Sequence, residues 1–449
     1  MTLRFGTDGV RGPASDFTDA LVIALGQAAA QVLGATTFVI GRDTRESGER
    51  IANALATGLL RGDAEPLRMG VVPTPAVAWV CAQRNVPGAV ISASHNRWSD
   101  NGIKFFAAGG RKLSDGLESA LESALDTALE ALVAEPKSSP RAAVAAADTD
   151  TEASVRAWCD AIGAVVESVA PLRIVIDCAN GAASSVAPQI FRSLGLDVEV
   201  LHAQPDGRNI NDQCGSTHPE SLQRAVVGSG AALGLAFDGD ADRLLAVDEL
   251  GNLIDGDQLI ALFACDLRER GLLANDQVVV TVMSNLGFRL AMEAQGIDVV
   301  ETPVGDRHVL EALARTGSSL GGEQSGHIVF ADLATTGDGI LSGVRLVDLV
   351  SRSEAPLSEL AAQVMERLPQ VLRNVRLETP RDDIAEFLAE AIAEEVAAVE
   401  ASLGTRGRVL IRPSGTEPLV RVMVEAPTVE QAEAAAGNLV AAVVRACSA

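Results

Sequence analysis

Several familiar signatures are missing from this 449-residue sequence, and each absence argues against one class of protein. No GxxxxGK[ST] motif is present, which excludes a P-loop nucleotide enzyme. The stretch GSGAALG at 228–234 misses the GxGxxG spacing and precedes a strand-like run, so it does not indicate a dinucleotide site. No GxSxG elbow surrounds Ser94, which argues against a serine esterase.

Paired cysteines and long apolar runs are also missing. The 6 cysteines are scattered without a CxxC pair, which predicts neither a disulfide framework nor a zinc ribbon and fits a reducing compartment. The N-terminal segment MTLRFGTDGVRG has no apolar signal core, and no uninterrupted apolar stretch reaches the ~18 residues of a membrane span. We therefore expect a soluble, cytoplasmic protein.

Basic residues are few relative to acidic ones. The chain has 36 Lys and Arg against 60 Asp and Glu, a formal net charge of −24. The electrostatic field of a protein with this net negative charge repels phosphate backbones and anionic membrane surfaces, so neither nucleic acid nor a membrane is expected as a partner. An anionic small substrate would need the few basic side chains to converge locally.

One arrangement of strand, polar turn, helix and second strand occurs three times, which predicts an α/β fold. The copies begin at TTFVIGRDTRESG, LRIVIDCANG and QVVVTVMSN, and Gly195 and Gly296 stand where helices should end. Strand, helix and strand in this order favour parallel pairing through right-handed crossovers. After about Pro369 a strand, a long helix, two strands and a final helix indicate a smaller α+β domain.

Composition places the domain boundaries. A stretch rich in Ala, Pro and Ser at 134–154 reads as a linker, and a second boundary falls near Asn252. We expect four domains at residues 1–150, 151–252, 253–368 and 369–449.

A polar loop, SASHN, lies between two apolar stretches that read as strands, Gly88 to Ile91 and Gly102 to Phe106. The Ser94 hydroxyl there is a candidate nucleophile. The alternative is an ordinary turn, since Ser and Asn side chains often bond nearby backbone groups.

Three carboxylates alternate in a second loop, DGDADR, after another apolar strand pattern. Asp238, Asp240 and Asp242 can converge on one hard cation, for which we favour Mg²⁺. An EF-hand is the competing interpretation, but Arg243 occupies the position that requires Gly and the flanks read as strands. A solvated acidic turn is the remaining alternative.

Two further loops carry recognition chemistry. GGEQSGH offers Glu323, Ser325 and His327 for sugar hydroxyls or an amine, although a lone His is often structural. RPSGTEP combines a guanidinium, two hydroxyls and a flexible backbone, which can bind a phosphate or form an ordinary hairpin turn. Its candidate residues, with one on the next strand, are Arg412, Ser414, Gly415, Thr416 and Arg421.

A hydroxyl nucleophile, a carboxylate metal site, a sugar-binding loop and a phosphate-binding loop together indicate phosphoryl transfer. The segments FGTDGVRG, SASHN with NGIKFF, DGDADR, GEQSGH and RPSGTEP, in this order, resemble the α-D-phosphohexomutase superfamily along nearly the whole chain. GGEQSGH with RPSGTEPLVRVMVE is most similar to the branch that acts on glucosamine phosphates, with mannose or glucose phosphates as the alternative substrates.

The resemblance implies a heart-shaped, four-domain architecture: three related α/β domains with mixed sheets and a smaller C-terminal α+β domain. It also implies Mg-dependent interconversion of 6- and 1-phosphates through phosphoserine at Ser94 and a glucosamine 1,6-bisphosphate intermediate. The implied Mg²⁺ site joins Ser94 to the three aspartates, with Arg243 nearby. The implied candidates for proton transfer and charge stabilisation are Arg11, His95, Lys104 and His327, and the implied substrate-binding residues are Glu323, Ser325, Arg412, Ser414, Gly415, Thr416 and Arg421.

One residue departs from the superfamily's usual pattern. Arg97 stands where a Pro generally follows SHN, and a Pro would fix the backbone there. The added cation beside Ser94 could alter the lifetime of a phosphoserine. The sequence leaves a monomer and a homodimer equally open.

Overall fold

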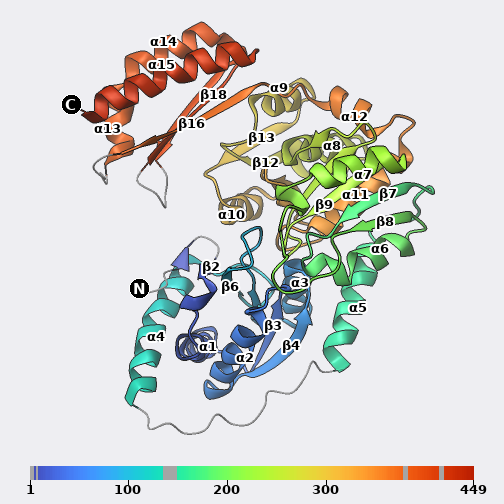
Figure 1. Cartoon of the computed structure of the whole chain (residues 1–449), viewed down its shortest axis with the longest axis vertical. Coiled ribbons are helices and arrows are strands. Elements are labelled where there is room, and N and C mark those ends of the chain that lie inside the picture. The colour runs from blue at the N-terminus through green and yellow to red at the C-terminus, as the bar shows by residue number, and fades with distance from the viewer. Residues whose placement is uncertain (1–4, 7–8, 135–148, 378–382, 414–418, 449) are drawn as a thin grey trace. The chain divides into compact units, whose positions relative to one another are not determined.

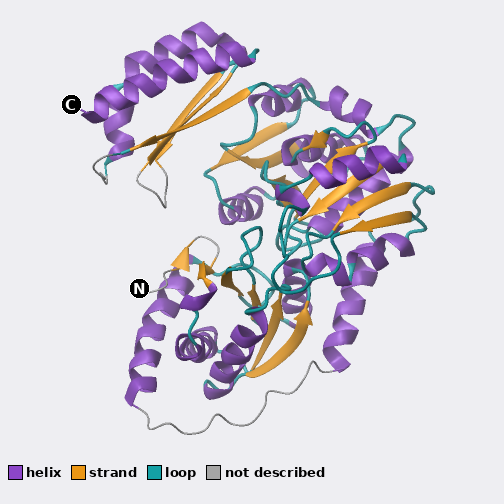
Figure 2. Cartoon of the chain, in the orientation of Figure 1, coloured by secondary structure: helices purple, strands orange, loops and turns teal. Residues whose placement is uncertain are grey.

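A computed structural model describes residues 5–6, 9–134, 149–377, 383–413 and 419–448. The chain divides into two compact units, one of residues 1–283 and 297–362 and the other of residues 284–296 and 363–449. Figures 1 and 2 show the alternation of helices and strands along the chain that the sequence predicts. In the described part of the chain, no helix is both long and apolar enough to cross a membrane.

The first sheet of the larger unit has six strands in the order β1-β2-β6-β5-β3-β4. β3 pairs in parallel with β4 and β5, as the first repeat predicts, whereas the other pairs are antiparallel. One face packs against α1, α2 and α4 through a core that includes Phe38, Ile40 and Leu55. The bounds are β1 Phe5–Gly6, β2 Gly9–Pro13, α1 Asp19–Leu33, β3 Thr37–Arg42, α2 Gly48–Arg61, β4 Glu65–Val71, α3 Thr74–Arg84, β5 Gly88–Ile91, β6 Asp100–Phe106 and α4 Asp115–Ala134.

The second and third sheets are mixed as well. Their strand orders are β11-β10-β9-β7-β8 and β13-β12-β14-β15, and the repeats β7–β8 and β12–β13 pair in parallel. The strands are β7 Arg173–Asp177, β8 Asp197–Leu201, β9 Leu233–Phe237, β10 Leu244–Asp248, β11 Leu253–Ile254, β12 Gln277–Thr281, β13 Asp298–Thr302, β14 Leu320–Gly322 and β15 Ile328–Phe330. The helices are α5 Thr149–Gly163, α6 Ala187–Ser193, α7 Glu220–Ser229, α8 Gly256–Glu269, α10 Asp306–Thr316, α11 Gly339–Arg352 and α12 Leu357–Val364, with the short 3₁₀ helices η1 Ala14–Asp16, η2 Ala182–Ser185, η3 Gly215–Thr217 and η4 Ala274–Asp276.

The smaller unit holds an antiparallel sheet in the order β16-β18-β17. The single long helix predicted from the sequence is two helices, because Ile392 leaves the helical conformation (φ −123°) and is buried in the core of this unit. The elements are α9 Leu286–Ala294, β16 Gln370–Arg376, α13 Ile384–Ala391, α14 Ala393–Leu403, η5 Gly404–Arg406, β17 Arg408–Pro413, β18 Leu419–Glu425 and α15 Val429–Ser448.

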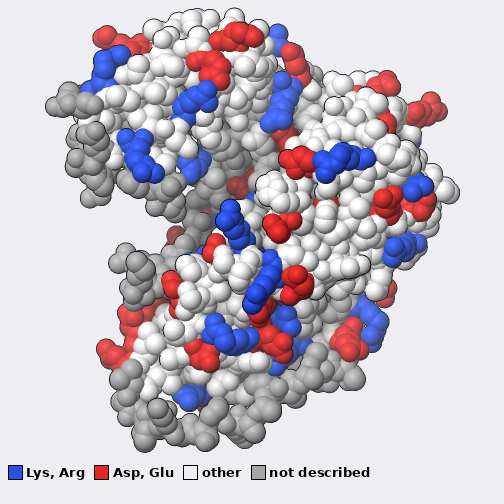
Figure 3. All heavy atoms as spheres, viewed as in Figure 1, with Lys and Arg blue, Asp and Glu red and all other residues white. Residues whose placement is uncertain are grey.

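Both glycines expected at helix ends have a left-handed backbone, with φ of +83° at Gly195 and +68° at Gly296. This conformation is the one that Gly adopts without a Cβ penalty. On the face drawn in Figure 3, basic and acidic side chains lie interspersed among uncharged ones.

Candidate active site

Ser94 lies in the turn that connects β5 and β6. Its side chain is buried, and its backbone is left-handed, with φ +51°. The Ser94 hydroxyl donates a hydrogen bond of 2.5 Å to Asp238 Oδ2 and lies 3.3 Å from His95 Nδ1. The candidate nucleophile therefore faces the aspartate loop, although 144 residues separate it from Asp238.

A buried ion pair holds this turn in place. The Arg45 guanidinium donates to the carbonyl oxygens of Ser94 (2.8 Å), Asn96 (3.0 Å) and Arg97 (2.5 Å). Its Nε pairs with Asp43 at 2.9 Å, and both side chains are fully buried. Left-handed backbone is strained for a residue with a side chain, so these bonds stabilise the conformation that points the hydroxyl inward.

A second set of hydrogen bonds to the Ser94 turn comes from Asn211, in the segment between β8 and β9 of the second sheet. The Asn211 amide donates to the carbonyl oxygens of Ser94 (2.8 Å) and Asn96 (3.0 Å). The exposed Arg97, which replaces the usual Pro, contributes its carbonyl to the Arg45 clamp. Neither Arg45 nor Asn211 belongs to a motif predicted from the sequence; the charged segment RDTR at the end of β3 was the available signal for Arg45.

The three aspartates converge between β9 and β10, where an EF-hand would require helices. One oxygen from each of Asp238, Asp240 and Asp242 lies within 4.8 Å of the others, and all three side chains are buried. Thr74 at the start of α3 donates to Asp240 through its N–H (2.9 Å) and its hydroxyl (2.7 Å). Lys104 on β6 bonds Asp240 Oδ2 at 3.1 Å and Asp242 Oδ2 at 3.2 Å.

This loop fits a hard divalent cation. The Oδ1 atoms of Asp240 and Asp242 are buried without a hydrogen-bond partner, and such oxygens are the ligands that Mg²⁺ and Ca²⁺ prefer. Burial and the charges of Asp242 and Asp240 raise the pKa of Asp238 well above its usual range. Burial also opposes ionisation of Asp242, but Lys104 and His327 outweigh it and hold its pKa well below the usual range.

We predict that Asp238→Asn stabilises the metal-free protein while weakening its response to Mg²⁺. The substitution removes a carboxyl group whose ionisation is opposed by burial and by the charges of Asp242 and Asp240, so the metal-free Tm should rise by about 2–4 °C. The rise in Tm that saturating MgCl₂ produces in the wild type should shrink strongly. Differential scanning calorimetry with and without MgCl₂ measures both effects. Asp212→Asn, at an exposed loop position, is the matched control, and equal responses of the two variants would contradict the metal site.

His327 is buried with both ring nitrogens engaged. Its Nε2 accepts a hydrogen bond of 3.2 Å from the Gly337 N–H, which puts the proton of the neutral ring on Nδ1. Nδ1 lies 3.7 Å from Asp242 Oδ2. Burial lowers the pKa of His327, but the bond to Asp242 and its charge outweigh it, so the net shift is upward. The structure therefore places His327 beside the aspartate loop.

Basic side chains lie near His95, the residue that follows Ser94. Arg11 on β2 pairs in register with Gly102 on β6. Burial lowers the pKa of His95 to about 4, and the charges of Arg243 and Arg11 act in the same direction. His95 is therefore neutral at pH 7, and its position beside two guanidiniums suits a phosphoryl group on Ser94.

The predicted sugar-binding loop connects β14 and β15 and docks on the aspartate loop. The Leu244 N–H donates to the Gly326 carbonyl at 3.0 Å, and a Cβ on Gly326 would meet the Leu244 oxygen at 2.1 Å, so the close approach requires Gly. Glu323 Oε1 accepts from the Gly305 N–H at 3.1 Å. Ser325 Oγ is buried without a hydrogen-bond partner, which leaves it free for a ligand hydroxyl.

Two guanidiniums lie side by side in the smaller unit. Arg412 on β17 is the direct cross-strand partner of Arg421 on β18. Burial, followed by the Arg421 charge, lowers the pKa of Arg412. Like charges directly opposite are destabilising unless an anion lies between them, so the pair fits a phosphate. Ser414, Gly415 and Thr416 of the same predicted site lie outside the described residues.

A second cluster with metal-ligating side chains is structural. One ligand atom from each of Asp177, His202 and Cys214 lies within 4.8 Å of the others. Asp177 already accepts from the N–H groups of Ala179 (2.9 Å) and Gly215 (3.0 Å), and His202 Nδ1 lies 2.9 Å away. The cluster thus anchors the segment that carries Asn211.

The pair of Asp177 and His202 predicts a pH-dependent contribution to stability. The hydrogen bond to Asp177 raises the pKa of His202, although burial opposes the shift. A raised folded-state pKa stabilises fully below the unfolded value of about 6.5, and this stabilisation is lost as pH rises through the folded value. The Tm difference between wild type and His202→Gln should be largest near about pH 5.5 and smallest above about pH 8.

Thermal melts across this pH range measure that difference. His308→Gln is the control, since His308 is 37% exposed and lies 3.9 Å from Glu311 on the same helix. A difference for His202→Gln that does not change with pH would contradict the prediction.

Comparisons with known proteins show which family models and which relatives the chain matches. The four models of phosphoglucomutase/phosphomannomutase match in order: alpha/beta/alpha domain I at residues 2–131, domain II at 156–251, domain III at 255–368 and the C-terminal domain at 372–442. Proteins named phosphoglucosamine mutase are 49% identical over 446 residues in Pelotomaculum thermopropionicum, covering 98% of each chain, and 50% identical over 462 residues in Frankia alni, covering 99% of each.

Solved structures share the fold. A phosphoglucomutase/phosphomannomutase family protein from Burkholderia thailandensis is 24% identical with a TM-score of 0.79, covering 98% of this chain and 97% of that one. Aspergillus fumigatus N-acetylphosphoglucosamine mutase, in complex with GlcNAc-6P and magnesium, is 19% identical with a TM-score of 0.69, covering 100% of this chain and 96% of that one. The predicted four-domain architecture with mixed sheets is thereby confirmed. With every domain of the family matched and relatives about half identical from end to end, this chain belongs to the phosphoglucomutase/phosphomannomutase family.

Proposed function

We propose that this chain is a Mg-dependent phosphoglucosamine mutase that interconverts glucosamine 6-phosphate and glucosamine 1-phosphate. The observation that carries the proposal is the 2.5 Å bond from the Ser94 hydroxyl to Asp238 within a trio of buried aspartates. A hydroxyl against a carboxylate cation site suits transfer of a phosphoryl group. The choice of an amino sugar as the substrate depends on the relatives at about 50% identity, which are named phosphoglucosamine mutase.

In this mechanism Ser94 carries the phosphoryl group and gives it to the free hydroxyl of the sugar phosphate. The bond from phosphorus to Ser94 Oγ breaks, a bond to the sugar oxygen forms, and the proton of the sugar hydroxyl ends on Ser94 Oγ. Glucosamine 1,6-bisphosphate results, and Ser94 then recovers a phosphoryl group from the other position. Asp238, Asp240 and Asp242 would hold Mg²⁺, which when bound would neutralise negative charge on the phosphoryl group.

Side chains near Ser94 would handle the proton and the negative charge during the transfer. Neutral His95, 3.3 Å from Ser94 Oγ, is placed to hold or return a proton there. Arg11 and Arg243 stabilise negative charge on the phosphoryl oxygens. Lys104 is bonded to Asp240 and Asp242, and His327 lies 3.7 Å from Asp242, so both would help to hold the aspartate loop while they remain candidates for proton transfer.

Substrate recognition falls to the other two predicted loops. Glu323 and Ser325 would bind hydroxyls or the amine of the sugar, since one offers a carboxylate acceptor and the other an unpartnered hydroxyl. Arg412 and Arg421, with Ser414, Gly415 and Thr416, would bind a phosphate of the substrate. Binding energy from the non-reacting phosphate would orient the reacting end.

Coupled assays with glucosamine, glucose and mannose phosphates test the proposal. We expect kcat/KM to be at least about tenfold higher for glucosamine 6-phosphate, as one charged hydrogen bond allows. Preference for mannose or glucose phosphate would instead make the chain a phosphomannomutase or phosphoglucomutase, with the transfer chemistry unchanged. Release of inorganic phosphate as fast as the substrate disappears would overturn the mutase reaction itself.

A further inference from the structure

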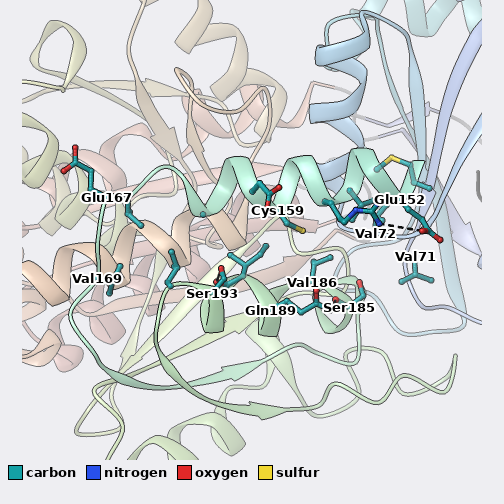
Figure 4. Close-up of a pocket in the computed structure, with 18 of the residues that line it drawn as sticks. Val71, Val72, Glu152, Cys159, Glu167, Val169, Ser185, Val186, Gln189 and Ser193 are labelled. Carbon is teal, nitrogen blue, oxygen red and sulfur yellow. Dashed lines mark hydrogen bonds and ion pairs between the residues drawn. The ribbon is translucent and has the colours of Figure 1, made fainter. Parts of the chain in front are cut away.

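A cavity of about 910 Å³ lies within the larger unit, apart from Ser94 and the aspartates. Its walls are the end of β4, one face of α5, and the segment of η2 and α6 (Figure 4). Cys159 on α5 is drawn opposite Val186 and Ser193 across this space. The volume is in the range of small-molecule sites.

The lining combines an apolar interior with a negative rim. Val72, Val186 and Ile190 are buried side chains of the wall. Among the described residues that line the cavity, Arg156 is the single basic one, and it pairs with Glu152 at 3.7 Å. Asp160 and Glu167 therefore leave the rim with excess negative charge. An apolar body with one positive charge complements such a lining.

Both walls of the cavity are directly connected to the aspartate loop. Thr74, two residues beyond Val72, donates to the Asp240 carbonyl and carboxylate. On the opposite wall, the Ala182 N–H of η2 donates to the Gly239 carbonyl at 2.8 Å. A Cβ on Gly181 would meet the Gly239 oxygen at 2.4 Å, so the close approach of this segment to the aspartate loop requires Gly.

We propose that this cavity is a regulatory site for a small amphiphilic organic cation, and that its occupancy changes the affinity of the aspartate loop for Mg²⁺. A ligand that separates β4 from α6 shifts Thr74 and Ala182, and each of these residues bonds a different residue of the loop. Coupling of this kind is reciprocal, so Mg²⁺ changes the ligand's affinity by the same factor.

The test uses n-octylammonium below its micelle concentration as the probe and Cys159 as the reporter. Burial, followed by Asp160, raises the pKa of Cys159 to about 11, so labelling with N-ethylmaleimide is followed over time at about pH 8.5 and read by peptide mass spectrometry. We expect the probe to slow labelling of Cys159 but not of exposed Cys447. Octanoate and tetramethylammonium, which lack the charge or the chain, should not protect.

Variants on one helix separate binding in the cavity from binding elsewhere. Val155→Arg adds a cation to the lining, whereas Ala157→Arg adds the same charge at an exposed position of α5 outside the lining. The first should weaken protection at least tenfold, and the second should leave it intact. Equal protection in both variants, or none in the wild type, would overturn the site.

Titration of the probe with and without MgCl₂ tests the coupling. The apparent affinity should change about fivefold or more, as typical coupling free energies imply, with a matching change in the Kd for Mg²⁺ by calorimetry. Identical affinities would overturn the regulatory role. None of these readouts requires turnover, so failure of the mutase assignment would leave them interpretable.

Discussion

Replacing Ser94 by alanine is expected to lower mutase turnover by about 10⁴-fold or more, because the substitution removes the hydroxyl that we propose as the carrier of the phosphoryl group. The aspartates remain, so the increase in Tm caused by MgCl₂ should persist. A coupled assay with glucosamine 6-phosphate measures turnover. Intact-mass analysis of the wild type, but not of the variant, should show a population heavier by one phosphoryl group.

Ser99→Ala is the matched control for that experiment. Ser99 lies in the same turn, its side chain is exposed, and its carbonyl accepts a hydrogen bond from the Ala14 N–H at 2.8 Å. This variant should retain wild-type turnover. If Ser94→Ala kept activity within about tenfold of wild type, the hydroxyl at position 94 would not be the phosphoryl carrier.

Replacing Arg45 by methionine should produce the largest loss of stability. The change leaves Asp43 as an uncompensated buried charge and removes three bonds to the Ser94 turn. Breaking a buried ion pair from one side costs about 3–5 kcal/mol. Turnover should also fall about 100-fold, because the Ser94 hydroxyl is displaced. Urea denaturation followed by fluorescence, together with the coupled assay, measures both effects.

Two variants show which part of the Arg45 effect is electrostatic. Asp43→Asn combined with Arg45→Met removes the unpaired charge and should recover part of the stability but little of the activity. Arg173→Met breaks an exposed pair with Glu199 at 3.3 Å and should cost no more than about 1 kcal/mol. An Arg45→Met loss no greater than that of Arg173→Met would show that the buried pair does not hold the turn.

The sequence alone was sufficient to predict the strands and to locate the polar loops between them. The strands at Gly88–Ile91 and around Gly102 are observed, as are the three parallel repeats. Three aspartates at alternate positions after a strand predict a cation site, because both the spacing and the repulsion are local. These features depend on residues close together in the chain, and a periodic pattern records them directly.

Contacts between distant segments were decided only by the tertiary structure. Arg45, Thr74 and Asn211 have no motif of their own, yet they fix Ser94 and Asp240 across 49 to 166 residues of chain. The neighbours of each His327 ring nitrogen, Gly337 and Asp242, likewise cannot be obtained from motif spacing. The division of the predicted long helix at Ile392 arose because burial of one side chain outweighed local helix propensity. The local sequence pattern thus predicts the secondary structure and the functional side chains that each loop carries. Which of these side chains contact one another is determined by the tertiary structure, because such contacts depend on packing between elements far apart in the sequence.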